Sequence, residues 1–252
     1  MENMAQLQSF VDGVPGKIDF PAHHCVYGKS MSGKSYLVTE ILNNMEKLLK
    51  RSESIPKILV VLSPHDEIEQ LLKDRLLEKW TIIHFNVEIF NQFLIDQMLN
   101  YLASERLLGK EIVVLMDDLI VQTSSSSNIN LFIVKSFAIL RHKNISLFAT
   151  VQNNCTALWE ILQNCAYIYI MQSFGCFTIL TKIIRVFLGL INVPNLIRKI
   201  YPLLEDNRRG SYIFINISRS ANFNKEFTIA NNIFQYTGFT KSYLTKLSVE
   251  DM

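Results

Sequence analysis

The sequence has few of the residues that would indicate a disulfide-bonded or zinc-binding protein. Among its 252 residues there are four cysteines, Cys25, Cys155, Cys165 and Cys176. They form no C-x-x-C pair and no His/Cys cluster with zinc spacing, so we expect buried thiols in a reducing compartment. The adjacent pair His23–His24 would need further ligands nearby to bind a metal, which favours a structural role for both side chains.

An excess of positive charge is also missing. The chain has 25 Lys and Arg against 23 Asp and Glu, which leaves a net charge of +2. Without a strongly basic body, general affinity for nucleic acid is not indicated, and any contact with DNA would have to come from a local patch.

Long apolar runs and a secretion signal are absent as well. The most apolar segment, residues 177–193, is interrupted by Lys182 and Arg185. Its uninterrupted apolar runs are much shorter than the roughly 20 residues that cross a bilayer, and its apolar positions recur with helical spacing. We therefore expect a buried or partner-facing helix here, no membrane insertion and a soluble protein.

What the sequence does contain is a complete phosphate-loop motif, G-x-x-x-x-G-K-[ST], between an apolar stretch and an amphipathic one. Glycines let successive backbone N–H groups point at a phosphate, the lysine neutralises the outer phosphates, and the serine hydroxyl ligates Mg²⁺. The motif predicts binding of a nucleoside triphosphate, taken to be ATP, together with Mg²⁺. The predicted binding residues are Gly28, Lys29, Ser30, Met31, Ser32, Gly33, Lys34, Ser35 and Tyr36.

After the loop, short apolar runs alternate with helical patterns, which is typical of a parallel sheet covered on both faces. The predicted strands are 57–62, 81–85, 111–116, 145–151 and 165–171, and the helices between them are 68–79, 87–105, 129–143 and one near 156–163. Beyond residue 175 we expect two helices and then strands 211–217 and 226–230, a hairpin at the sheet edge. This predicts one α/β P-loop NTPase domain over residues 1–252, RecA/ASCE-like, with a core of about 18–175 and an extension of about 176–252.

Two acids follow the apolar strand 111–116. A carboxylate at the end of a buried strand beside the phosphate-loop strand can hold Mg²⁺ through water, and the next acid can activate a water molecule. We assign Asp117 to the metal, together with Ser35, and Asp118 to the general base. Gln152, at the end of a later strand, would lie near the terminal phosphate and sense its presence.

The run "RHKNISLFATVQN" (141–153), preceded by "VYGKSMSGKS" and "IVVLMDDL", resembles the genome-packaging ATPases of the poxvirus type. These belong to the FtsK/HerA superfamily of ring-shaped DNA translocases, with relatives in giant viruses, virophages and Polinton/Maverick elements. The similarity covers roughly residues 18–155. The second acid, Asp118, is shorter than the glutamate that is commoner in the family.

The resemblance implies an ATP-driven translocase of double-stranded DNA that packages a genome into a capsid. It also implies a homo-oligomeric ring, a pentamer or hexamer, with capsid or portal vertex proteins as partners, in the host cytoplasm, a viral factory or the virion. The implied catalytic residues are Lys34, Asp118, Gln152 and an arginine supplied by the neighbouring subunit. Arg141 is the first candidate for that arginine and the turn Arg208–Arg209 the second.

Other functions share the phosphate loop. A Ras-like GTPase would need an N-K-x-D motif and an ABC-type ATPase an L-S-G-G-Q-like motif, and neither is present. Another P-loop ATPase, a small nucleotide kinase and a non-catalytic binding module stay open. The uncharged segment 120–130 could contact DNA or serve as a surface linker.

Overall fold

The computed structural model describes residues 10–11, 14–15, 20–45, 57–76, 80–86, 92–118, 127–152, 158–171, 176–188, 212–216, 233–236 and 245–246. The elements are β1 (Phe10–Val11), β2 (Val14–Pro15), β3 (His23–Tyr27), α1 (Lys34–Asn43), β4 (Lys57–Ser63), α3 (Glu67–Arg75), β5 (Trp80–Asn86), α4 (Gln92–Leu107), β6 (Glu111–Met116), α5 (Ser127–His142), β7 (Ser146–Val151), α6 (Leu158–Asn164), β8 (Tyr167–Met171), α7 (Cys176–Leu188), β9 (Tyr212–Asn216), β10 (Ile233–Tyr236) and β11 (Thr245–Lys246).

Nine strands form one sheet in the order β11-β10-β9-β8-β3-β7-β6-β4-β5. The six strands from β8 to β5 run parallel, and β9, β10 and β11 each run antiparallel to the strand before them. The predicted α/β class, a mainly parallel sheet extended at one edge by antiparallel strands, is confirmed. Because the parallel strands all end at the same edge, the residues that follow them gather there.

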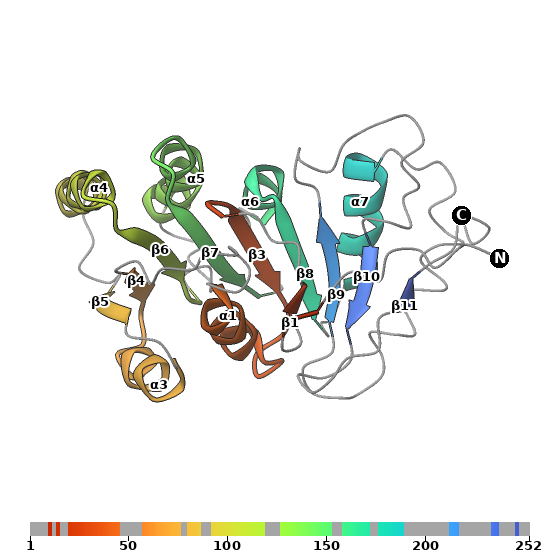
Figure 1. Ribbon diagram of the computed structural model, residues 1–252. Coiled ribbons are helices and arrows are strands. Elements are labelled where there is room, and N and C mark those ends of the chain that lie inside the picture. Colours follow the sequence, from red (N-terminus) through yellow and green to blue (C-terminus); the bar gives the residue numbers. More distant parts are fainter. Residues whose placement is uncertain are drawn as a thin grey trace.

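Helices cover both faces of the sheet (Figure 1). Helices α4, α5, α6 and α7 lie on one face, and α1 and α3 lie on the other. Side chains alternate between the faces along each buried strand. In β6, Ile112 and Val114 pack toward the first set of helices, whereas Val113 and Leu115 pack toward the second. Strands buried on both faces are apolar at most positions, which explains the apolar runs in their sequences.

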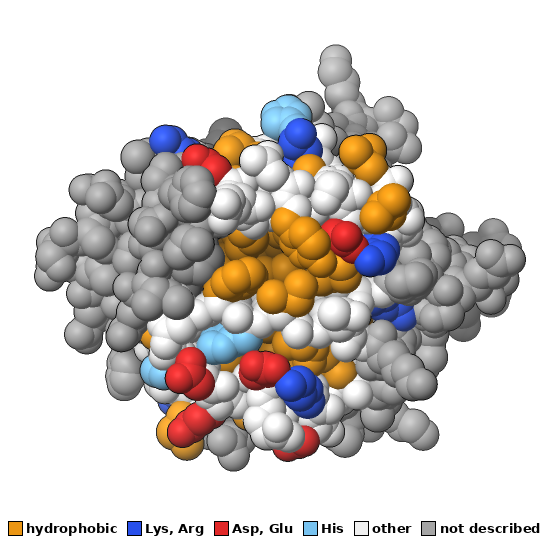
Figure 2. Space-filling model, turned by 90° about the vertical axis from the view of Figure 1, so that its left-hand side faces the viewer, with side chains coloured by type: hydrophobic (Ala, Val, Ile, Leu, Met, Phe, Trp, Pro, Cys, Tyr) orange, Lys and Arg blue, Asp and Glu red, His pale blue; other side chains and the backbone are white. Residues whose placement is uncertain are grey.

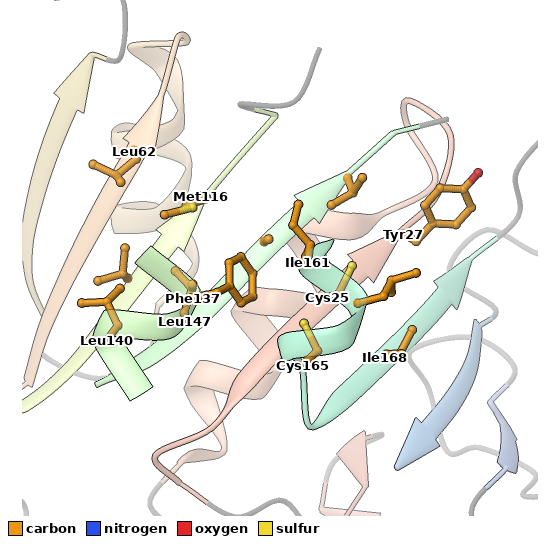
Figure 3. Close-up of a cluster of buried hydrophobic side chains, with 14 of the residues drawn as sticks. Cys25, Tyr27, Leu62, Met116, Phe137, Leu140, Leu147, Ile161, Cys165 and Ile168 are labelled. Atoms are coloured by element: carbon orange, nitrogen blue, oxygen red, sulfur yellow. The ribbon is translucent and has the colours of Figure 1, made fainter. Parts of the chain in front are cut away.

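Among the described residues, the larger cluster of buried hydrophobic side chains lies between the sheet and helices α4 to α7, and Figure 3 shows part of it. Phe137 of α5 and Ile161 of α6 pack onto the central strands, and neither side chain is accessible to solvent. Cys25 of β3 and Cys165 also lie in this cluster as free, buried thiols. The expectation of buried thiols therefore holds for these two cysteines, and the other two lie outside the residues whose burial is described.

The pair His23–His24 forms part of the buried strand β3. The ring of His24 stacks on Phe148 with centroids 4.0 Å apart, and its Nδ1 atom lies 3.2 Å from the Tyr169 hydroxyl. Within the described part of the chain, no three His, Cys, Asp or Glu side chains gather as a metal site. These contacts give His24 a structural place in the aromatic packing.

The C-terminal strands extend the sheet at one edge, as predicted, but with a different second strand. β9 lies within the predicted strand 211–217, and its antiparallel partner is β10 at Ile233–Tyr236. The predicted strand 226–230 lies outside the described residues, as does the second of the two helices expected after residue 175. None of the described helices has the length and apolar character needed to cross a membrane.

At the opposite edge, β5 pairs with β4 along its whole length. Its Ile82 and Ile83 are half-buried, in contrast to the fully buried β4. Figure 2 views the molecule from this side and shows apolar side chains gathered in the middle of the face, with acidic and basic groups around them. The site described below lies at the carboxyl ends of the more central strands.

Candidate functional site

The phosphate loop lies between β3 and α1, as its motif requires. The Gly28 N–H donates to the Val151 carbonyl at 3.0 Å, which ties the start of the loop to β7. Gly33 has a φ of 99°, in the left-handed region that favours glycine, and it stands at the N-cap of α1. Because glycine has no side chain that could cap the helix, the first-turn N–H groups remain available to an anion.

Close packing explains why the first loop position is glycine. A Cβ atom on Gly28 would lie 2.6 Å from the Ser32 Oγ and 2.9 Å from the Met171 Cβ. The Ser32 hydroxyl is itself buried and donates to the Met171 sulfur at 3.7 Å. Met171 is the last residue of β8, so the neighbouring strand supports the underside of the loop. Of the remaining loop residues, Ser30 and Met31 are exposed.

Lys34 bends back over the loop. Its Nζ donates to the Gly28 carbonyl at 3.2 Å and to the Lys29 carbonyl at 2.9 Å. Burial lowers the pKa of Lys34, and the charges of Asp118 and Asp117 oppose that effect. The ammonium group is thus held beside the N-terminus of α1, which has no side-chain cap and where the phosphates of a nucleotide would lie.

The two acids lie next to the loop, although their strand does not adjoin β3. We expected the acidic strand beside the phosphate-loop strand, and this was wrong, because β7 lies between β6 and β3. The Ser35 hydroxyl nevertheless donates to Asp117 Oδ1 at 3.2 Å. Asp117 is close enough because it follows β6 at the shared edge, where its N–H donates to the Leu62 carbonyl of β4.

Asp117 is buried, which raises the pKa of its carboxyl group. Hydrogen bonds from Thr150 and Ser35, and the charge of Lys34, oppose this rise. A carboxylate and a hydroxyl in contact offer two hard oxygen atoms, the ligand type that Mg²⁺ prefers. Together with the Lys34 ammonium and the N-terminus of α1, these oxygens fit the phosphates and metal of Mg²⁺-ATP.

The second acid, Asp118, contacts Gln152. The Gln152 amide, directly after β7, donates to Asp118 Oδ1 at 3.0 Å. Asp118 has a φ of 51°, in the left-handed region that is uncommon for residues other than glycine. The strand order explains the contact, because β7 and β6 are neighbours and both end at this edge.

No protein-family model matches the sequence, and no curated protein matches it. The structure, by contrast, resembles solved ones. It superposes on B204, the DNA-packaging ATPase from Sulfolobus turreted icosahedral virus, with a TM-score of 0.52, 14% identity, and coverage of 79% of this chain and 94% of that one. For the genome-packaging NTPase B204 of Sulfolobus turreted icosahedral virus 2 in complex with AMPPCP, the values are 0.53, 13%, 78% and 92%. The chain shares their fold.

B204 of the second virus also matches in complex with ATP-gammaS, with a TM-score of 0.51 and 12% identity. At identities this low the likeness extends to the fold alone. The assignment of roles to single residues therefore rests on the contacts in this chain.

Arg141, the predicted arginine for a neighbour's site, lies far from the loop of its own chain. It is exposed in the last turn of α5 and close enough to His23, the first residue of β3, to lower the pKa of that histidine. The loop begins at Gly28, just beyond the other end of β3, and five residues at about 3.3 Å each place it roughly 16 Å from His23. Arg141 is therefore poorly placed for its own site. Arg208 and Arg209, and residues 120–126 of the segment 120–130, lie outside the described residues.

Two residues at the site were not predicted from the sequence. Met171 supports Gly28 and Ser32, and Thr150 contacts both acids. Thr150 resembles any β-branched strand residue when the sequence is read alone. Its one distinguishing sign is its place, two residues before Gln152 and directly after the apolar run 147–149.

Proposed function

We propose that this protein is an ATP-driven translocase of double-stranded DNA that packages a viral or virus-like genome into a capsid. The proposal depends most on one observation: the phosphate loop, the two acids Asp117 and Asp118, and Gln152 lie together at one edge of the sheet. Ser35 contacts Asp117, and Gln152 contacts Asp118. The shared fold with packaging ATPases of two viruses supports the choice of DNA as the substrate that is moved.

The proposed chemistry assigns one task to each side chain. Lys34 and the N-terminus of α1 bind the phosphates, while Ser35 and Asp117 provide oxygen atoms for the metal. When bound, Mg²⁺-ATP supplies the phosphoryl group to be transferred and the cation that offsets its charge. Asp118 accepts a proton from the attacking water. Gln152 orients the Asp118 carboxylate through their hydrogen bond.

The proposal includes assembly into a homo-oligomeric ring, a pentamer or hexamer, with capsid or portal vertex proteins as partners in the host cytoplasm or a viral factory. A ring would bring the Arg141 edge of one subunit toward the loop of the next. This is the role in which an arginine placed away from its own site can act, since it stabilises charge on the phosphoryl group in the neighbouring subunit.

ATPase assays with and without long duplex DNA test the proposal, on protein whose oligomeric state has been measured. We expect duplex DNA to raise the rate several-fold and small nucleotide acceptors to have no effect. Lys34→Ala should abolish turnover and so defines the background. A rate that DNA does not change but that rises with a nucleoside monophosphate would instead identify a small nucleotide kinase. A rate that responds to neither would favour another kind of P-loop ATPase.

A further inference from the structure

A single buried hydroxyl group contacts both acids of the site. Thr150 lies in β7 with no exposed surface. Its Oγ1 donates to Asp117 Oδ1 at 2.7 Å and accepts the backbone N–H of Asp118 at 3.0 Å. A hydroxyl has one hydrogen to donate and two lone pairs. In Thr150 the hydroxyl hydrogen is donated to Asp117, and a lone pair accepts the N–H of Asp118.

The hydrogen bond to the Asp118 N–H is made at a residue whose backbone conformation is unfavourable. A left-handed φ such as the 51° of Asp118 costs free energy for a residue with a side chain, and it persists only when surrounding contacts hold it. Thr150 belongs to the adjacent strand and accepts the N–H of that same residue. The contact therefore favours the backbone turn that directs the Asp118 carboxylate toward Gln152.

The bond to Asp117 constrains a side chain that is costly to bury. The Asp117 carboxylate loses most of its hydration, and the short bond from Thr150 replaces part of it. The same oxygen atom, Oδ1, also accepts from Ser35. Two hydroxyl groups from two different elements thus hold one carboxylate oxygen beside the phosphate loop.

We propose that Thr150 is a positioning residue of the nucleotide site, which orients Asp117 toward the metal and Asp118 toward the attacking water. The roles of the two acids rest on the proposed function, and Thr150 acts only through them. Without its hydroxyl, Asp117 would lose a buried hydrogen bond and Asp118 would lose the partner of its strained N–H. Metal-assisted binding and turnover would then weaken together.

Ser146 supplies a matched control in the same strand. It is also fully buried, but it lies at the other end of β7, where its hydroxyl accepts the Ala22 N–H at 3.2 Å. Ser146→Ala removes a buried hydroxyl without touching either acid. Thr150→Val removes the hydroxyl and keeps the shape, whereas Thr150→Ser keeps the hydroxyl.

The first measurement is binding of a fluorescent ATP analogue with Mg²⁺ and with EDTA. We expect Thr150→Val to bind like the parent in EDTA and to lose most of the gain that Mg²⁺ gives. In turnover, kcat should fall about ten- to a hundredfold, the usual range for losing a hydrogen bond to a buried charged group. Thr150→Ser should stay within about threefold of the parent, since only a methyl group is lost.

Thermal unfolding is measured on every variant, and Thr150→Ala replaces Thr150→Val if the latter does not fold. Parent-like Mg²⁺ dependence and kcat in a folded Thr150→Val protein would overturn the inference, and so would an equal loss in Ser146→Ala. If the parent itself hydrolyses no ATP, the proposed function fails, whereas the Mg²⁺ dependence of nucleotide binding still tests Thr150.

Discussion

The side-chain amide of Gln152 donates a 3.0 Å hydrogen bond to the carboxylate of Asp118, and so joins the ends of β7 and β6. The two residues are 34 positions apart in the sequence. This contact links the proposed phosphate sensor to the proposed base. A change in the position of either side chain must therefore affect the other.

Gln152→Glu should slow turnover by removing this bond. The new carboxylate would face Asp118 at hydrogen-bond distance, and two like charges so close repel each other. We expect kcat to fall about tenfold or more while nucleotide affinity stays within about threefold, because the proposed ligands of the phosphates and the metal are Lys34, Ser35 and Asp117. Gln152→Ala, which loses the bond without adding charge, should be less impaired. Equal kcat in parent and Gln152→Glu would contradict the proposed link.

Asp118→Asn should separate binding from turnover. Asparagine keeps the shape and can still meet Gln152, but it cannot accept a proton from water. We expect nucleotide binding near that of the parent and a kcat lower by about a hundredfold or more, the usual contribution of general-base catalysis. Asp117→Asn is the matched comparison, because it should also weaken binding that depends on Mg²⁺. An Asp118→Asn protein as active as the parent would disprove the assignment.

Gly28→Ala should damage the site through packing. The added Cβ would lie 2.9 Å from the Met171 Cβ, which cannot move without shifting β8. We expect nucleotide affinity to fall about tenfold or more and stability to fall by about 1–3 kcal/mol, the usual cost of overpacking. Gly109→Ala is the control, since its Cβ would have no atom within 4 Å although its φ is +83°. It should cost stability and leave nucleotide binding intact.

Acid should destabilise the protein through its buried histidines. Burial, with a smaller effect from Arg141, lowers the pKa of His23 to about 4, and burial lowers that of His24 well below its usual value. The unfolded chain takes up these protons near pH 6.5 and the folded chain does not, so stability falls as the pH drops from about 6.5 to 4. For His23 alone the full loss is about 3 kcal/mol.

The measurement is urea unfolding at pH 7 and pH 5 for the parent, His24→Phe and His65→Gln. The His24 ring stacks between aromatic neighbours, so phenylalanine keeps the stacking and removes one proton-binding site. We expect His24→Phe to lose less stability between the two pH values than the parent. His65 is exposed, and its replacement controls for the loss of a histidine that is not buried. Identical pH dependence in all three proteins would contradict the prediction.

Local pattern sufficed to predict the parallel strands of the sheet, because a strand buried on both faces is apolar at most positions. The run 111–116 coincides with β6, and 57–62 lies within β4. Strand order was harder to predict, since it depends on where each crossover returns, and we wrongly expected the acidic strand beside the phosphate-loop strand. Thr150 was not predicted for the same reason. Its contacts are with residues that follow another strand, and the residues next to it in the sequence do not indicate them.

Complementation between two inactive variants tests whether Arg141 acts on the neighbouring subunit. Arg141 lies at the edge of the sheet where β3 and β7 begin, away from its own phosphate loop, so in the proposed ring it would act on a neighbour's site. Arg141→Ala and Asp118→Asn should each be nearly inactive alone. When subunits of the two are mixed, an Arg141→Ala subunit keeps an intact site and can receive Arg141 from an Asp118→Asn neighbour.

With equal amounts and random assembly, about a quarter of the sites are complete, and about that share of the parent rate should return. Lys143→Ala, which removes another exposed basic side chain at the same edge, should be active by itself. A mixture that stays as inactive as its components, under conditions where the subunits exchange, would exclude a role for Arg141 in the neighbouring site.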